Sequence, residues 1–259
     1  MNVFLKILII IVSLILIMRG ASYLLQNKSM VQDSIMDATT LTKISASSLD
    51  KGTVGNNNFS YSTWFYVSDW NYRYGQYKVI LGRMSSTSSS NKSSINGING
   101  IGPCPLISLG QTQNNISIMQ NCYKGENNLN TNAKSRPNDV VHTCVVSNVP
   151  IQKWVNLIIS VYGRTLDVYI DGKLIKTCLL PGIAKVNSNA DLLITPNGGF
   201  NGFTARTQYW PNPMNPDQAW SIYAKGFKNT SIWNMVSPNY SVKVSVVNNK
   251  DNTEKKITF

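Results

Sequence analysis

The chain has 259 residues and a formal charge of +12, from 24 Lys and Arg against 12 Asp and Glu. An apolar content of 42% with only 14% charged residues excludes an intrinsically disordered chain, and the length suits one large β domain plus an appendage. The single histidine, His142, argues against His-based metal sites and Ser-His-Asp chemistry.

The first predicted element is a membrane anchor. Residues 7–18 are almost entirely apolar, and the wider segment 3–25 has the length of about 20 residues that a helix needs to cross a bilayer core. Lys6 and Arg19 flank the run, where long basic side chains reach the headgroups. The competing interpretation is a signal peptide cleaved after residues 20–22. We expect an uncleaved single-pass anchor that holds the protein in a lipid bilayer, in an orientation that its flanking charges do not decide.

Residues 26–55 contain no aromatic residue and are rich in Ser, Thr, Asp, Lys and Gly. Their apolar residues are too scattered for an amphipathic stripe. We therefore predict a stalk or loosely packed linker over this range.

The body of the chain, residues 56–230, is predicted to be all-β. From Phe59 onward, apolar residues alternate or form short runs broken by turn residues about every 8–12 positions, which is typical of an antiparallel two-sheet sandwich. The clearest strands are 154–162, 165–170 and 173–178, and two-residue connectors join them.

These connectors fix an expected register. It places three apolar pairs on one face, and Asp167 between two neighbours on the other face. The apolar pairs are Val161 with Leu166, Ile159 with Val168, and Val168 with Ile175; the neighbours of Asp167 are Ser160 and Lys176.

Four cysteines allow three disulfide pairings. Cys104 and Cys122 lie at equal distances from residue 113, the middle of a second predicted hairpin, so that hairpin favours their pairing. Cys144 and Cys178 remain as the other pair. The alternative is four buried thiols, as in a reducing compartment.

One short helix is predicted near the end of the domain. Asn215 suits its N-cap, Pro216 its first position, and Lys225 with Gly226 its end. Residues 231–259 then alternate again before a charged stretch, which predicts a C-terminal β extension and basic tail.

Three stretches together resemble the concanavalin A-like lectin/glucanase superfamily, and specifically its laminin-G-like jelly rolls. They are Phe59–Val67, Pro150–Trp154 with the Tyr169–Lys173 hairpin, and Gly199–Gly202 with Met214–Tyr223. The resemblance spans roughly residues 56–227. It implies a two-sheet jelly roll whose members include lectins and glycosidases.

The cysteine before Trp154, and the Thr177–Gly182 stretch after the hairpin, are similar to membrane-anchored members encoded by large double-stranded DNA viruses. An Asn-, Lys- and Ile-rich composition agrees with an AT-rich genome. This resemblance implies a virion protein held in the internal membrane, with its jelly roll facing capsid proteins.

Catalysis by the superfamily's usual route is not expected. Retaining glycosidases need two carboxyl groups about 5–5.5 Å apart. The chain has only two glutamates, Glu126 and Glu254, both in polar stretches without a suitably spaced acid. His142 precedes Cys144 by two positions, but an ordinary partly buried histidine explains it better than a Cys-His pair. The aspartates are too dispersed for a calcium site, so no metal or cofactor is expected.

Two aromatic loops are the candidate binding sites for a glycan or a protein. The competing interpretation is that alternate rings pack in the core. The first loop contributes Trp70, Tyr72, Arg73, Tyr74 and Tyr77, and the second contributes Tyr209 and Trp210.

Basic charge is uneven along the chain. Residues 73–136 hold seven bases and one acid, yet no nucleic-acid-binding motif accompanies them. The sequence therefore favours a non-catalytic, membrane-anchored structural protein of a virus particle. The alternative is a cell-surface or secreted glycan-binding lectin with its sugar site at residues 70–77.

Overall fold

The computed structural model describes residues 29–49, 52, 56–84, 94–95, 98–99, 102–123, 140–227, 243–248 and 253–258. The predicted anchor, residues 3–25, lies outside these residues. Within the described ranges, no helix combines the length and the apolar character needed to cross a bilayer.

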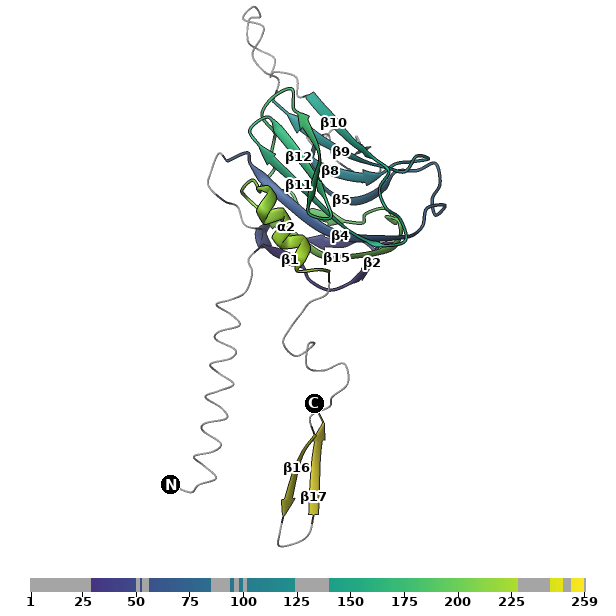
Figure 1. Cartoon of the computed structure of the whole chain (residues 1–259), viewed down its shortest axis with the longest axis vertical. Helices are drawn as coiled ribbons and strands as arrows, with labels where there is room; N and C mark the ends of the chain where they lie inside the picture. The colour runs from purple at the N-terminus through teal and green to yellow at the C-terminus, as the bar shows by residue number, and fades with distance from the viewer. Residues whose placement is uncertain are drawn as a thin grey trace, which may run out of the picture.

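The domain is a sandwich of two antiparallel sheets (Figure 1), as predicted, and its architecture is consistent with a jelly roll. The seven-stranded sheet has the order β1-β15-β4-β11-β12-β13, and β2 also pairs with β15. Its strands are β1 (Met30–Gln32), β2 (Met36–Asp37), β4 (Phe59–Asp69), β11 (Trp154–Tyr162), β12 (Thr165–Ile170), β13 (Lys173–Leu179) and β15 (Asn201–Trp210).

The six-stranded sheet has the order β10-β9-β8-β5-β14-β3. Its strands are β3 (Thr42–Ile44), β5 (Lys78–Met84), β8 (Pro103–Leu109), β9 (Asn115–Cys122), β10 (Val140–Ser147) and β14 (Leu192–Ile194). Two separate hairpins pair β6 (Ser94–Ile95) with β7 (Ile98–Asn99), and β16 (Lys243–Asn248) with β17 (Thr253–Thr258). A short 3-10 helix, η1 (Ala46–Ser48), follows β3.

The core fills the space between the two sheets. In β4 and β11, alternate apolar side chains point inward, because successive residues of a strand face opposite sides of its sheet. Phe65 and Val67 from β4, and Val155 and Leu157 from β11, are at most 1% exposed and belong to one apolar cluster. The side chains between them therefore face outward.

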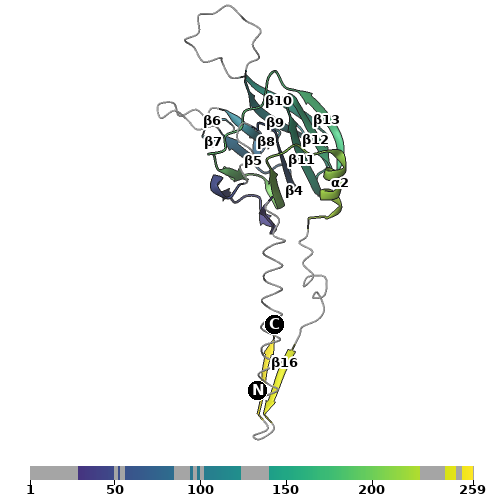
Figure 2. The same cartoon turned by 90° about the vertical axis from the view of Figure 1, so that its left-hand side faces the viewer.

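The helix α2 (Pro216–Ala224) covers part of the outer face of the seven-stranded sheet, away from the six-stranded sheet (Figure 2). Its predicted cap is confirmed. The Asn215 side chain accepts a bond from the Gln218 N–H at 2.8 Å, and the Gln218 side chain accepts one from the Asn215 N–H at 3.0 Å. Ala219 packs in a cluster with Ile158 and Tyr169 of the sheet.

The register of the β11–β12–β13 meander confirms part of the prediction. Val161 pairs with Leu166 and Ile159 with Val168. Between the Tyr169–Leu174 and Val168–Lys176 pairs, a bulge adds one residue to β13. Val168 therefore lies opposite Lys176 and not opposite Ile175. For the same reason Asp167 lies beside Thr177, whose hydroxyl donates to its carboxylate at 2.6 Å, and the predicted Lys176 neighbour is wrong.

The predicted 26–55 linker is wrong for most of its length, because residues 29–49 belong to the sandwich. β1 and β2 pair with β15, and β3 pairs with β14. Ala38 is completely buried in the core. These strands are only two or three residues long, so they carry no recognisable alternation.

One of the two predicted disulfides is confirmed. Cys144 in β10 and Cys178 in β13 are bonded, which joins an edge strand of each sheet. The predicted Cys104–Cys122 bond is wrong. The β8–β9 hairpin pairs Leu106 with Met119, a register offset by one residue from the one that would set the two cysteines opposite each other. Both are buried, and their Sγ atoms lie 3.6 Å from backbone carbonyl oxygens.

The long strands give the sandwich two distinct ends. Asn201 of β15 pairs with Asp69 of β4 at one end, and Trp210 pairs with Ser60 at the other. We name them the Asp69 end and the Trp210 end. The first described residue, Ser29, accepts a hydrogen bond from the Tyr209 N–H at 2.8 Å, so the N-terminal segment joins the sandwich at the Trp210 end.

Candidate functional site

The candidate site is an aromatic groove on the outer face of the seven-stranded sheet, toward the Asp69 end. Phe203 of β15 pairs with Tyr66 of β4, and Tyr66 pairs with Trp154 of β11, so three rings form one row across three strands. The Tyr66 ring centroid lies 6.4 Å from that of Phe203 and 5.8 Å from that of Trp154. The row faces outward because the neighbouring positions Phe65 and Val155 fill the core.

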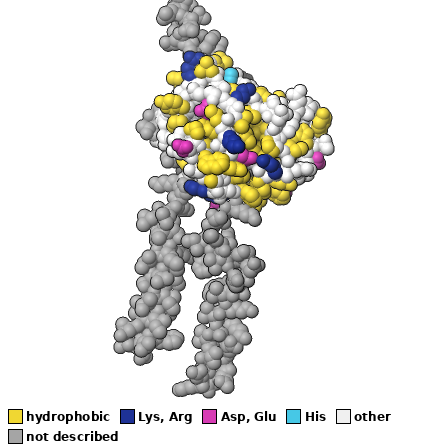
Figure 3. Space-filling view, viewed as in Figure 1, with side chains coloured by type: hydrophobic (Ala, Val, Ile, Leu, Met, Phe, Trp, Pro, Cys, Tyr) yellow, Lys and Arg dark blue, Asp and Glu magenta, His cyan; other side chains and the backbone are white. Residues whose placement is uncertain are grey.

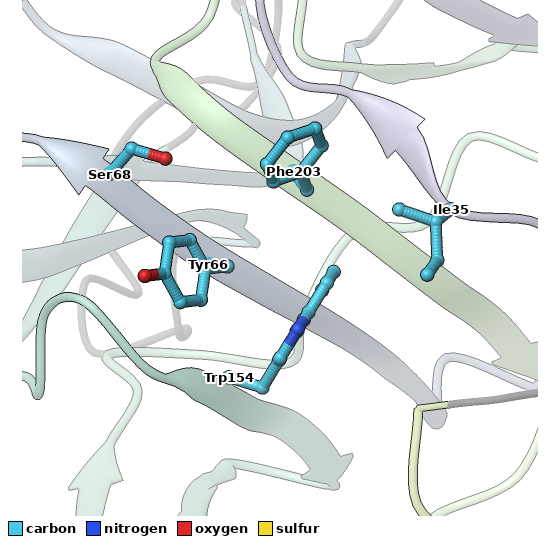
Figure 4. Close-up of a pocket in the computed structure, with 5 residues that line it drawn as sticks. All are labelled: Ile35, Tyr66, Ser68, Trp154 and Phe203. Atoms are coloured by element: carbon cyan, nitrogen blue, oxygen red, sulfur yellow. The ribbon is translucent and has the colours of Figure 1, made fainter.

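Ile35 and Ser68 complete the lining of the groove. Ile35 comes from the turn between β1 and β2, and Ser68 lies two residues beyond Tyr66 on the same face of β4. Figure 4 shows these side chains arranged around one hollow, which has a volume of about 480 Å³. Ile35 is 49% exposed and Phe203 43% exposed, so the groove presents apolar surface to solvent.

Further rings buttress the groove from the α2 side. The Phe227 ring stacks on Trp154 with centroids 4.4 Å apart and an interplanar angle of 14°. Trp64 lies two residues before Tyr66 on the same face of β4. Its ring stacks on that of Tyr223 in α2, with centroids 5.7 Å apart. These contacts fix the orientation of Trp154, so the groove is preformed.

The five lining residues carry no charge. An ion pair lies next to Trp154 in the sequence, where Lys153 Nζ is 3.1 Å from Asp171 Oδ2. Asp171 is held in place because its other carboxylate oxygen accepts a bond from the Asn156 N–H at 2.9 Å. The lining therefore offers ring faces, the Tyr66 and Ser68 hydroxyls and the indole N–H, which suit stacking and hydrogen bonding and not proton transfer. Within the described ranges, no cluster of three His, Cys, Asp or Glu side chains could hold a metal ion.

The first predicted aromatic loop, between β4 and β5, lies at the Asp69 end but its rings differ in exposure. Trp70 is half-buried against the core, with the Lys78 ammonium 4.5 Å from its ring centroid. Tyr72 and Tyr77 are also half-buried, whereas Tyr74 is 60% exposed. The loop is tied to its neighbour because the Arg73 guanidinium donates to the Asn197 carbonyl and to Gln76 Oε1.

The second predicted pair, Tyr209 and Trp210, lies at the opposite end of the sandwich. Tyr209 is only 4% exposed; its ring centroid is 4.8 Å from that of Tyr61, and the Arg83 guanidinium carbon is 5.7 Å from it. A ring buried in this way cannot contact a ligand. Trp210 is partly buried against the cluster beneath α2. The two predicted loops therefore lie at opposite ends of the sandwich.

Sequence reasoning missed the groove. The alternation in Phe59–Val67 predicts that Tyr66 faces outward, and the sequence also predicts that a strand starts at Trp154. Phe203 and Ile35, however, join them only through the pairing of β15 with β4 and with β2. No local signal in the sequence contains that information.

No known protein family's sequence profile matches the chain, and no curated protein is similar to it in sequence. Several solved structures are similar in fold. The receptor-binding domain of botulinum neurotoxin C/D mosaic serotype aligns with a TM-score of 0.49 and 10% identity, over 77% of this chain and 44% of that chain. The botulinum neurotoxin serotype D binding domain gives 0.49 and 10%, over 75% and 43%.

The binding domain of botulinum neurotoxin DC in complex with SialylT gives 0.47 and 12% identity, over 75% of this chain and 45% of that chain. The chain thus spans less than half the length of the solved chains it matches. At these identities the likeness concerns the sandwich fold alone.

Proposed function

We propose that the protein is a non-catalytic, membrane-tethered sandwich that binds a partner through the aromatic groove. The observation that carries this proposal is the outward-facing row of Phe203, Tyr66 and Trp154. Three large rings left accessible on neighbouring strands and held by Phe227 form a preorganised apolar surface, which is typical of recognition sites.

Binding fits this surface better than catalysis does. The lining holds no carboxylate, imidazole or thiol to act as acid, base or nucleophile. The chain's two glutamates are not among the groove residues. Aromatic rings with a few hydroxyls instead give contact area at a low cost in conformational entropy.

We further propose that residues 3–25 anchor the chain in the internal membrane of a large DNA virus particle, and that its groove contacts a capsid protein. The apolar run supports this role, and so does the resemblance of Cys144 and the Thr177–Gly182 stretch to membrane-anchored viral jelly rolls.

The test uses the full-length chain in purified particles. Chemical cross-linking with mass spectrometry should link peptides around Ile35, Tyr66 or Phe203 to a capsid protein. Phe203→Ser should reduce those links several-fold, because it removes an exposed ring and leaves the core intact. Ile175→Ser is the matched control, since Ile175 is also exposed but lies on β13 at the sheet edge. Absence of the chain from purified particles, or equal cross-linking by the two variants, would refute this role.

A glycan-binding protein is the second candidate. The rings of Tyr66 and Trp154, tilted by 55° with the Ser68 hydroxyl beside them, match the stacking and hydrogen bonding that a saccharide needs. A glycan array probed with the full-length chain in detergent tests this function. Loss of saccharide binding in Phe203→Ser places the sugar in the groove, and loss in Tyr74→Ala places it at the β4–β5 loop. Trp70→Ala is less informative because Trp70 packs on buried Lys78.

A further inference from the structure

The Trp210 end of the sandwich carries a second exposed surface, separate from the groove. The β11–β12 turn, the loop after β13 and the end of β9 meet there. The Leu180 N–H donates to the Arg164 carbonyl at 2.7 Å, and the Tyr123 N–H donates to the Ile183 carbonyl at 2.9 Å. The Gly163 N–H donates to Asn58 Oδ1 at 2.9 Å, which connects this surface to the start of β4.

Large apolar side chains project from this end. Leu179 at 71% and Tyr162 at 67% are the two most exposed large apolar side chains of the described residues. Ile183 and Tyr123 are about half exposed. Exposed leucine, isoleucine and tyrosine side chains at adjoining loop tips are costly in water unless something covers them.

Basic side chains lie among these apolar ones. Arg164 is exposed at the tip of the β11–β12 turn, and its Nε donates to the Leu180 carbonyl at 3.1 Å. Lys185 Nζ lies 4.5 Å from the centroid of the Tyr123 ring. The segments 56–60, 122–123, 162–165 and 179–185 contain these two cations and no acidic residue. The face of the domain in Figure 3, by contrast, carries both basic and acidic side chains between its hydrophobic patches.

The chain enters the sandwich at this end. Only residues 26–28 separate Leu25, the last residue of the predicted anchor, from Ser29 in the sandwich. Four Cα-to-Cα steps span at most about 14 Å. The headgroup layer occupies about 5–8 Å on each side of the hydrocarbon core. A chain anchored through residues 3–25 therefore cannot hold Ser29 far above the headgroups.

We infer that the surface formed by Tyr123, Tyr162, Arg164, Leu179, Ile183 and Lys185 lies on an anionic bilayer. This inference rests on the proposed membrane anchor. Tyrosine rings and aliphatic tips enter the headgroup region, and the two cations pair with anionic lipids. We name this set of six residues the membrane-facing surface.

This orientation has a consequence for the groove. Phe203 pairs with Tyr66, six positions along β4 from Ser60, which pairs with Trp210. At about 3.3 Å per residue, the groove lies about 20 Å along β4 from the Trp210 end, on the side away from the bilayer. A partner in the aqueous phase can therefore reach the groove while the opposite end contacts lipid.

Hydrogen–deuterium exchange of the full-length chain tests the inference. The chain is placed in nanodiscs of phosphatidylcholine, in nanodiscs with added phosphatidylserine, and in detergent. Peptides covering Tyr123, residues 162–165 and residues 179–185 should exchange several-fold more slowly in phosphatidylserine nanodiscs than in detergent. Peptides covering residues 70–77 at the Asp69 end should exchange at the same rate in all three.

Charge reversal provides the matched comparison. Arg164→Glu and Lys185→Glu should each reduce the protection several-fold. Lys173→Glu, an exposed lysine at the other end of β13, should leave it unchanged. Thermal unfolding of each variant checks that the sandwich remains folded.

The outcomes separate the inference from the anchor on which it rests. A chain that remains in the nanodisc but shows no added protection at the Trp210 end refutes the membrane-facing surface and leaves the anchor intact. Protection of residues 70–77 instead would show the opposite orientation and refute it equally. A chain that does not co-purify with the nanodisc refutes the anchor, and the inference with it.

Discussion

The ammonium group of Lys78 lies 4.5 Å from the ring centroid of Trp70, at a position where the lysine side chain is completely buried. No hydrogen-bond acceptor reaches its Nζ atom within the described part of the chain. The face of the indole therefore replaces the missing acceptors, because the ring's negative face attracts a cation. This pair links the predicted binding loop to the first residue of β5.

Substitutions of the two partners should change the free energy of unfolding in opposite directions. Lys78→Met keeps the length of the side chain and removes a buried charge without hydrogen bonds, so it should raise the free energy of unfolding by about 1–3 kcal/mol. Trp70→Ala should lower it by about 2 kcal/mol or more, because it removes core contacts and leaves the cation unpaired. Chemical denaturation of the full-length chain in detergent measures both. A destabilised Lys78→Met variant would show that the attraction of the ammonium to the indole outweighs the cost of burying its charge.

The same lysine predicts a pH dependence. Burial, with a smaller contribution from nearby Arg73, lowers the pKa of Lys78 below its ordinary value of 10.5. Between the folded and unfolded pKa values the unfolded chain binds more protons, so stability rises with pH across that window. The stability advantage of Lys78→Met over wild type should therefore be largest near neutral pH and should shrink toward about pH 10.5. Thermal unfolding of both proteins over this range measures it, and a constant difference would contradict the buried-charge explanation.

The structural features that the sequence predicted correctly are those with local causes. Asn215 followed by Pro216 defines the start of α2, because a cap and a first-turn proline act within a few residues. The two-residue connector after Tyr162 sets the pairing of Val161 with Leu166. A bulge in β13 then shifts the register by one residue, so Ile175 does not lie opposite Val168. The alternation of a strand contains no signal for a bulge, and the sequence therefore did not predict this shift.

The features that the sequence did not predict depend on distant pairing. β1 is only three residues long and is stabilised by β15, whose Gln208 pairs with Met30. The groove has the same origin, since Phe203 reaches Tyr66 only through the register of β15 on β4. Tyr209 is the opposite case, because the sequence places it in a candidate binding loop and the structure places it in the core. It lies beside a proline-rich turn that is typical of a surface loop, yet its ring packs on Tyr61 in the core.

The Cys144–Cys178 bond should contribute substantially to stability. It joins residues 34 apart in sequence, and a closed loop of that length reduces the entropy of the unfolded chain by the equivalent of about 3–4 kcal/mol. The Cys144→Ala/Cys178→Ala double variant should lose about that much, and reductant should lower the melting temperature of the wild type but not of the variant. Cys122→Ala should keep the sensitivity to reductant, because Cys122 is not in this bond. A non-reducing peptide map that links Cys144 or Cys178 to a different cysteine would contradict the assignment.

Gly202 precedes Phe203 on β15 and lies against the backbone of β4. Its substitution should lower both the free energy of unfolding and the affinity of the groove for its partner. Its φ of +153° is a conformation that other residues rarely adopt, and an added Cβ would collide with the Tyr66 carbonyl oxygen. Gly202→Ala should therefore cost about 2 kcal/mol or more and displace Phe203 from the Tyr66 ring.

Gly75 provides the matched control for this substitution. Its φ is +78°, but a Cβ there would meet no atom within 4 Å. Gly75→Ala should cost only about 1 kcal/mol of backbone strain and leave the groove unchanged. Thermal unfolding measures the stability of both variants, and exchange of peptides around Phe203 reports on the groove. Equal losses in the two variants would show that backbone strain alone, and not the close approach of β15 to β4, explains the glycine at position 202.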